Sequence, residues 1–233
     1  FSAKLLNIIM MKHLLIICLA ALSFTGIYAQ DVFVPMNYVA LEKKIQKSNT
    51  DIVDPKKEID PKVWIKRGEI MHSVYEIDLE QIYEGMNPTN LTLFYPEPVV
   101  TTEELDGRTY TVYSYDRIKF YFENNALFMW KKTKWAFENP LQEAYKCFVK
   151  AQELDTEGKQ DEKLLEDYNK LKNHLKKNGI NSYYEGNKEG ALVNFELVLA
   201  INELPILNGA MDTILIQYSG IIAREMGQYD TPI

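Results

Sequence analysis

Histidine, cysteine and paired carboxylates are the side chains of this 233-residue sequence that could take part in chemistry. Of its three histidines, His72 and His174 lie beyond the N-terminal segment. Neither belongs to a Cys- and His-containing pattern with the spacing of zinc ligands, so the sequence predicts no metal site. Both are interpreted as histidines on a helix surface or in a groove.

Cys147 is the cysteine that lies beyond the N-terminal segment. It directly precedes Phe148 on the predicted packing face of a helix, where a small buried thiol is expected rather than a nucleophile. The acidic pairs at 103–104 and 161–162 are expected to face water or a helix N-terminus. Because the sequence also contains neither a Gly-rich phosphate loop nor a nucleophile elbow, it predicts a non-enzymatic protein without a catalytic residue or a cofactor.

The N-terminal segment, residues 1–29, has the pattern of a secretory signal peptide. Lys12 precedes an apolar run over residues 14–22, and a small-residue site ends at Ala29. The run is too short to cross a bilayer comfortably, so no retained membrane span is expected. The residues before Met10 are interpreted as a non-native extension. The pattern therefore predicts an exported protein.

Charge and composition limit the class of partner. Removing Lys4 and Lys12 with the N-terminal segment leaves 24 basic against 33 acidic residues, a balance of −9. This balance argues against a nucleic-acid partner, because binding to phosphates needs a basic surface. Hydrophobic residues make up 46% of the sequence, which is enough for a sizeable core.

Two helical segments that are far apart in the sequence carry the pattern of one paired-helix repeat. The first has a large residue at Trp64 and a glycine at Gly68, and the second has a small residue at Ala144 and an aromatic residue at Phe148. In such a repeat the glycine lets the two helices approach closely, and the large residues fill the space between them. The pattern predicts that these two helices pack together.

A second copy of the pattern is more compact. Leu175 and Gly179 are followed by Ala191, twelve residues after the glycine, and by Phe195 four residues later. In a standard repeat the small residue of the second helix falls twelve residues after the glycine of the first, so this copy matches. A third copy has Gly220 at its glycine position.

With these residues the chain resembles secreted tetratricopeptide-repeat (TPR) proteins of the Bacteroidetes. The resemblance rests on the segments 54–57, 62–68, 139–144 and 151–155, and it covers most of the chain outside residues 85–138. It implies a mainly α fold, a TPR-like α-solenoid, and a place in the periplasm or at the outer membrane. Its motifs specify the repeat architecture and not a biochemical role.

The departure from an ordinary repeat is an insertion between the two helices of the first copy. Residues 109–115 and 117–122 alternate with β-branched and aromatic residues, and Asn124-Asn125 indicates a hairpin turn. The alternation predicts a small β-containing insertion inside the first repeat. A helix over residues 120–135 remains an alternative, because the apolar residues there can also be arranged on one helical face.

These patterns divide the sequence into consecutive segments. In order, they are the signal peptide with its extension (1–29), an N-terminal helix and linker (30–60), the first helix of repeat 1 (61–80), the β-containing insertion (81–138), the second helix of repeat 1 (139–156), repeat 2 (161–203) and a truncated repeat 3 (212–233).

The function expected from such a solenoid is binding, because the first helices of its repeats line an extended concave surface. The sequence therefore predicts a scaffold that binds a protein or peptide partner in a groove on the second and third copies. The residues predicted to line this groove are Lys176, Ile180, Tyr183, Gln217, Ile221 and Arg224.

Two alternatives to a protein-binding scaffold remain open. One is a glycan-binding component of the cell envelope that uses aromatic residues of the insertion. The other is the repeat region of a larger enzyme or receptor. The aromatic candidates for glycan binding are Tyr113, Tyr115, Trp130 and Trp135.

Overall fold

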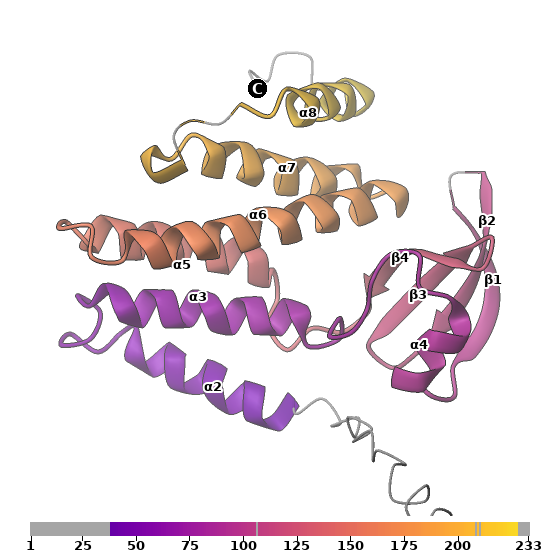
Figure 1. Ribbon diagram of the computed structural model, residues 1–233, viewed down its shortest axis with the longest axis horizontal. Coiled ribbons are helices and arrows are strands. Elements are labelled where there is room, and N and C mark those ends of the chain that lie inside the picture. Colours follow the sequence, from indigo (N-terminus) through magenta and orange to yellow (C-terminus); the bar gives the residue numbers. More distant parts are fainter. Residues whose placement is uncertain (1–37, 106, 208, 210, 228–233) are drawn as a thin grey trace, which may run out of the picture. The chain divides into compact units, whose positions relative to one another are not determined.

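Residues 38–105, 107–207, 209 and 211–227 are described by the structure, which is a computed structural model (Figure 1). The described residues belong to one unit, Met36–Ile233. The predicted signal peptide at 1–29 lies outside the described residues, and so do residues 228–233 of the predicted third repeat.

The first two helices, α2 (Tyr38–Asp51) and α3 (Pro61–Glu76), pack against each other. The start of α3 follows from its local sequence. The Asp60 side chain accepts a hydrogen bond from the backbone N–H of Lys62 at 2.9 Å, which caps the helix. A proline then occupies the first helical position, where no N–H is needed for the helix.

Arg67 connects α3 to two other helices although it is itself buried. Its guanidinium donates to Ser48 Oγ at 2.9 Å and to Asn49 Oδ1 at 2.7 Å, both on α2. Its Nε lies 2.8 Å from Glu143 Oε1 on α5 (Pro140–Leu154). These hydrogen bonds and the ion pair with Glu143 compensate the buried charge of Arg67, so that the helical core can accommodate it.

The chain continues into α6 (Asp161–Tyr184) and α7 (Lys188–Asn202), which form a second packed pair after α3 and α5. A short 3₁₀ segment, η1 (Pro205–Leu207), precedes α8 (Thr213–Glu225), which packs on α7 (Figure 1). The Asp212 side chain caps α8 by accepting a hydrogen bond from the N–H of Leu215 at 3.1 Å.

Both helix pairs cross at a glycine. A Cβ atom added to Gly68 would lie 2.2 Å from Cε1 of Phe148, and one added to Gly179 would lie 2.4 Å from Cε1 of Phe195. No real Cβ atom fits at such distances. Glycine is therefore required at both crossings by the close approach of a phenylalanine ring.

Between α3 and α5 the chain forms a short helix and a sheet. The four strands are antiparallel and lie in sequence order, β1-β2-β3-β4, with a register shift between Tyr121 and Phe122. The elements are α4 (Pro88–Phe94), β1 (Val99–Leu105), β2 (Arg108–Ser114), β3 (Ile118–Glu123) and β4 (Ala126–Lys132).

Both faces of the sheet carry buried aromatic residues, because neighbouring side chains of a strand point to opposite faces. One face buries Phe120 and Phe122 with Leu91 of α4. The other buries Tyr110 and Tyr121, and Tyr184 of α6 packs on it. The sheet is thus a structural layer with two buried clusters of its own.

The predicted fold class, a mainly α, TPR-like solenoid with a small β-containing insertion, is therefore wrong. Along the described part of the chain run seven α-helices and one four-stranded antiparallel sheet, which is a mixed α/β fold. The alternative of a helix over 120–135 is also wrong, because β3 and β4 occupy most of that segment. The spacing of the helical repeat does not reveal the sheet, whose two buried clusters make it a layer of the fold in its own right.

A buried ion pair ties the end of β4 to the residues after α3. Lys132 Nζ lies 3.0 Å from Asp78 Oδ2, and the two side chains are 3% and 4% exposed. Lys132 also donates to the carbonyl oxygen of Val74 at 2.9 Å, and the Tyr38 hydroxyl donates to the Asp78 carboxylate. This network joins α2, α3 and the sheet at one point.

Within the described ranges, no helix is both long enough and apolar enough to span a membrane.

Candidate functional site

The face predicted as a partner groove lies on two helices. The predicted residues are Lys176, Ile180 and Tyr183 on α6, and Gln217, Ile221 and Arg224 on α8. Lys176 Nζ lies 2.6 Å from Oδ2 of Asp212, the residue that caps α8, so an ion pair links the two helices. Gln217 and Arg224 are exposed, whereas Ile221 and Tyr183 are half-buried.

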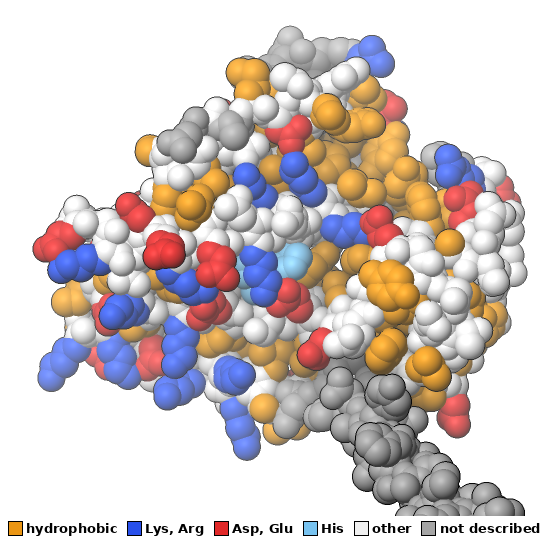
Figure 2. All heavy atoms as spheres, in the orientation of Figure 1, with side chains coloured by type: hydrophobic (Ala, Val, Ile, Leu, Met, Phe, Trp, Pro, Cys, Tyr) orange, Lys and Arg blue, Asp and Glu red, His pale blue; other side chains and the backbone are white. Residues whose placement is uncertain are grey.

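Apolar side chains are exposed on the same two helices. Ile180 of α6 is 42% exposed, and Ile214 and Tyr218 of α8 are 65% and 56% exposed. Figure 2 shows hydrophobic side chains gathered in the upper part of the molecule, over α7, α8 and the end of α6. An exposed apolar patch of this kind indicates an interaction surface. We call it the α6–α8 face.

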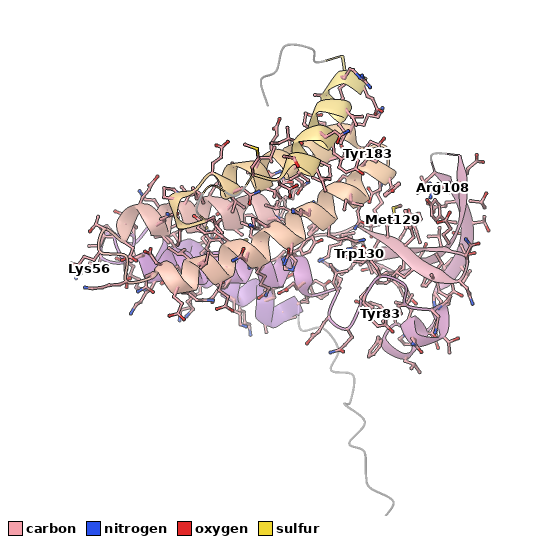
Figure 3. All side chains as sticks on the ribbon, turned by 45° about the horizontal axis from the view of Figure 1, so that its top comes forward. Lys56, Tyr83, Arg108, Met129, Trp130 and Tyr183 are labelled. Atoms are coloured by element: carbon pink, nitrogen blue, oxygen red, sulfur yellow. The ribbon has the colours of Figure 1, made fainter. Side chains whose placement is uncertain are left out.

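A second candidate site, which we call the aromatic–amide groove, lies where α3, β4, α6 and α7 meet. It consists of two adjoining hollows that share lining residues. Figure 3 shows Trp130 at the boundary between the sheet and the helices. The shared residues are Tyr75, Trp135, Asn178, Ser182 and Asn187. Trp130, Lys131, Lys132 and Glu185 complete one hollow, and Gln142 and Asn194 are among those that complete the other.

The aromatic residues of the groove are held in place by neighbouring rings and cations. The Tyr75 and Trp135 rings are stacked, with centroids 6.3 Å apart and planes 23° apart. Lys132 Nζ lies 4.6 Å from the centroid of Trp135, and Lys177 Nζ lies 4.7 Å from that of Trp130. Cation–π contacts of this kind stabilise an indole in one orientation.

The amides of the groove are also oriented before any ligand arrives. Asn178 Nδ2 donates to Asn194 Oδ1 at 3.1 Å, and Asn194 Nδ2 donates to the carbonyl oxygen of Gly190 at 2.6 Å. Asn187 caps α7 by accepting from the N–H of Gly190 at 2.9 Å. The Tyr75 hydroxyl oxygen is buried and has no aligned hydrogen-bond partner among the described residues.

Three charged side chains that line the groove, Lys131, Lys132 and Glu185, form ion pairs. Lys132 pairs with Asp78, and Lys131 Nζ lies 3.0 Å from Glu185 Oε2. Burial lowers the pKa of Lys132 to about 8, against the opposing effect of the Asp78 carboxylate. Burial likewise raises the pKa of Glu185, while Lys131 opposes it. The groove therefore suits an uncharged ligand better than an ion.

The structure separates the aromatic residues that were predicted for glycan binding. Tyr113 and Tyr115 are half-buried and pack against the buried cluster that contains Phe120, apart from the groove. Trp130 and Trp135 line the aromatic–amide groove. Sequence reasoning missed Tyr75, Asn178, Asn187 and Asn194, and the signal that could have found the last three is the clustering of Asn and Ser around the turn between α6 and α7.

His72 and His174 lie next to each other although they are far apart in the sequence. Their ring centroids lie 5.4 Å apart, and Phe148 contacts His72 at 5.3 Å. His72 is buried, so its prediction as a surface or groove residue is wrong. Burial, together with His174, lowers the pKa of His72 to about 3. His72 is therefore neutral at physiological pH, and its low pKa makes it a poor general base.

Glu76 and Cys147 complete the set of chemically relevant groups. Burial alone would raise the pKa of Glu76, but hydrogen bonds from His174 and Lys170 outweigh it and lower that pKa to about 2. Cys147 is buried, and this burial raises its thiol pKa to about 12. Neither group is activated for nucleophilic or acid–base catalysis near neutral pH.

Comparisons with known proteins return nothing: no family model, no curated protein and no solved structure matches the chain.

Proposed function

We propose that this chain is a non-enzymatic binding protein that holds an uncharged saccharide in the aromatic–amide groove. The observation that carries the proposal is the lining of one groove by Trp130, Trp135 and Tyr75 together with several carboxamides. A pyranose ring has an apolar C–H face, which stacks on indole, and a rim of hydroxyls that both donate and accept hydrogen bonds. Carboxamides also donate and accept, so the two sets of groups are complementary.

A proline-rich peptide, the other common ligand of aromatic-lined grooves, fits less well. Such a segment offers mainly acceptors and would leave the amide oxygen of Asn178 without a donor. The paired charges Lys131–Glu185 and Lys132–Asp78 also argue against an anionic ligand. The N-terminal pattern predicts an exported protein, and saccharides are common ligands in the cell envelope.

Calorimetric titration of the full chain with neutral oligosaccharides tests the proposal. We use gluco-, xylo- and chito-oligosaccharides, with tryptophan fluorescence as a second readout because the sugar would stack on an indole. Trp135→Ala should weaken binding about tenfold or more, since aromatic contacts are worth about 1 kcal/mol and more beyond their buried area. Tyr218→Ala, on the α6–α8 face, is the matched control and should bind normally. Absence of binding to all three series would refute the proposal.

A second candidate function is the binding of a protein partner on the α6–α8 face. It is favoured by the exposure of Ile180, Ile214 and Tyr218. Lys172 and Arg224 make no ion pair within the described residues, so the face has cations left over to meet carboxylates. The fitting partner is an amphipathic helix with an apolar stripe and acidic flanks.

Cross-linking of the purified chain to an acidic amphipathic peptide, with and without Ile214→Asp and Tyr218→Asp, tests this second function. Both positions are exposed, so these variants should fold normally. Cross-links that join the peptide to α8, mapped by mass spectrometry, should disappear in the two variants and persist in Trp135→Ala. Equal cross-linking in all of them would eliminate the α6–α8 face as a docking site.

A further inference from the structure

A third surface, independent of the saccharide proposal, lies between the first two helices. Here α2 and α3 leave a cleft of about 400 Å³, which is within the size range of ligand-binding pockets. Figure 2 shows Lys and Arg side chains gathered over these helices, at the lower left. We call it the α2–α3 cleft. Its lining residues are Lys44, Lys47, Ser48, Asp51, Val63, Lys66, Glu69, Ile70 and Ser73.

Helical spacing explains why these residues share one cleft. Lys44, Lys47 and Asp51 are three and four residues apart, and so lie on one face of α2. Val63, Lys66 and Ile70 have the same spacing on α3. Each helix therefore contributes lysine to the cleft, and α3 contributes an aliphatic floor.

The carboxylates of the cleft are already engaged by lysines from outside it. Asp51 Oδ1 lies 2.6 Å from Nζ of Lys57, and Glu69 Oε1 lies 2.9 Å from Nζ of Lys163. A hydrogen bond from Lys57 is the largest cause that lowers the pKa of Asp51, and the charges of Lys47 and Lys66 act in the same direction. The cleft's own lysines thus surround carboxylates that other residues neutralise.

Three cations remain without a counterion. Lys44, Lys47 and Lys66 are exposed, and none of them forms an ion pair in the described part of the chain. The sequence as a whole has a formal net charge of −7, so this concentration of positive charge is local. Like charges held together cost free energy, and an anionic partner would relieve that cost.

We propose that the α2–α3 cleft binds an acidic amphipathic peptide segment of another protein. Glutamate or aspartate side chains of the segment would meet Lys44, Lys47 and Lys66, and an aliphatic side chain would contact Val63 and Ile70. The aliphatic floor favours a peptide over an acidic polysaccharide, whose rings carry hydroxyls. The lysines line a concave surface and not a flat one, which favours a peptide over a membrane.

Fluorescence anisotropy with a labelled peptide tests this proposal. The peptide has glutamate at every third or fourth position and leucine between them, and the ionic strength is about 20 mM, so that screening is weak. The full chain that carries Ile214→Asp and Tyr218→Asp, which remove the α6–α8 face as a second docking site, should bind it. A peptide with lysine in place of glutamate should not bind. Raising the salt to about 500 mM should release the acidic peptide, because exposed charge pairs are strongly screened.

Two sets of charge reversals identify the surface. The cleft variant Lys44→Glu/Lys47→Glu/Lys66→Glu should bind at least about tenfold more weakly, because three attractive contacts become repulsive. The control variant Lys134→Glu/Lys150→Glu/Lys159→Glu has the same net charge and changes lysines that are 45–70% exposed elsewhere. It should bind within about twofold of the unmodified chain. Far-ultraviolet circular dichroism checks that both sets fold.

Three outcomes would overturn the proposal. If both variants lose binding equally, net charge is responsible and the cleft is not the site. If Val63→Thr, which makes the floor polar at constant shape, leaves the affinity unchanged, there is no aliphatic contact. If the chain binds vesicles that contain phosphatidylglycerol and ignores the peptide, the surface recognises an anionic membrane instead.

Discussion

The helix pairs α3/α5 and α6/α7 are built alike but connected differently. Each crosses at a glycine that a phenylalanine ring covers, Gly68 with Phe148 and Gly179 with Phe195. Residues 77–139 connect the first pair, whereas only residues 185–187 connect the second. The same crossing thus forms with either connection, because it depends on contacts between the helices and not on the chain that joins them.

The long connection is tolerated for a physical reason. Closing a flexible loop costs only about 0.6 kcal/mol more for each doubling of its length. Here the connection is also folded, as a sheet with two buried clusters. Lys132 joins the sheet to α3, because it donates to the carbonyl oxygen of Val74 and pairs with Asp78 just after the helix. A pair of packed helices can therefore accept a whole folded layer between them, and this layer places Trp130 in the groove.

The ion pair between Lys132 and Asp78, which has no counterpart in the α6/α7 pair, should have the greatest influence on stability. Lys132→Met leaves the Asp78 carboxylate buried without its cation, which should lower the free energy of unfolding by about 3–5 kcal/mol. Urea denaturation measures this loss. The double variant Lys132→Met/Asp78→Asn removes the charge as well and should recover much of the stability. A single variant that is as stable as the original chain would show that the sheet is not held at this point.

The glycine crossings should respond alike if the two pairs are alike. Gly68→Leu and Gly179→Leu would each force a side chain against a phenylalanine ring, and overpacking of this kind costs about 1–3 kcal/mol. Thermal melting compares the two variants with Asn173→Leu, which adds leucine at an exposed position of α6. A loss of thermal stability at one crossing and none at the other would show that the two helix pairs are not packed alike.

The stability of the two helix pairs should depend differently on pH. Four residues after its glycine, the first pair has His72 and the second pair has Tyr183. The folded-state pKa of His72 is about 3, below its ordinary value of 6.5. Between pH 6.5 and pH 3, therefore, His72 binds a proton in the unfolded chain but not in the folded one. The contribution of His72 to the free energy of unfolding is fully present above pH 6.5 and decreases as the pH falls below that value. The slope should reach up to about 1.4 kcal/mol per pH unit.

Urea denaturation at pH 7.0, 6.0 and 5.0 measures this slope, since most carboxylates stay ionised above pH 5. His72→Leu should flatten it, and Tyr183→Leu should not. A slope that is unchanged in His72→Leu would assign the pH dependence to another group.

A weaker test of the two crossings uses Cys147. This residue directly precedes Phe148 in the first pair, and Asn194 holds the same position before Phe195 in the second. Because burial raises the thiol pKa to about 12, the folded protein should not react with a thiol reagent at pH 8. In a chain that carries Cys18→Ser, dithionitrobenzoate should report no free thiol before urea is added and one afterwards. Rapid labelling of the folded chain would mean that the first crossing opens more easily than its packing implies.

The local features of this protein can be predicted from its sequence alone. The spacing of Gly179, Ala191 and Phe195 reflects contacts between helices that are close in the chain, and such contacts leave a readable period. The alternation in residues 109–122 likewise marked strands, because a strand repeats every two residues. The fold class was nevertheless predicted wrongly, since no local period shows that the four strands make one sheet with buried clusters on both faces.

The positions of the candidate sites follow from tertiary packing and not from a local sequence pattern. Tyr75, Trp135 and Asn178 belong to three separate segments, and they line one groove because α3, the chain after β4 and α6 pack together. The pairing of His72 with His174 has the same origin. Contacts between such distant residues depend on how whole elements pack, and the free energy of that packing is spread over many side chains that no short motif contains.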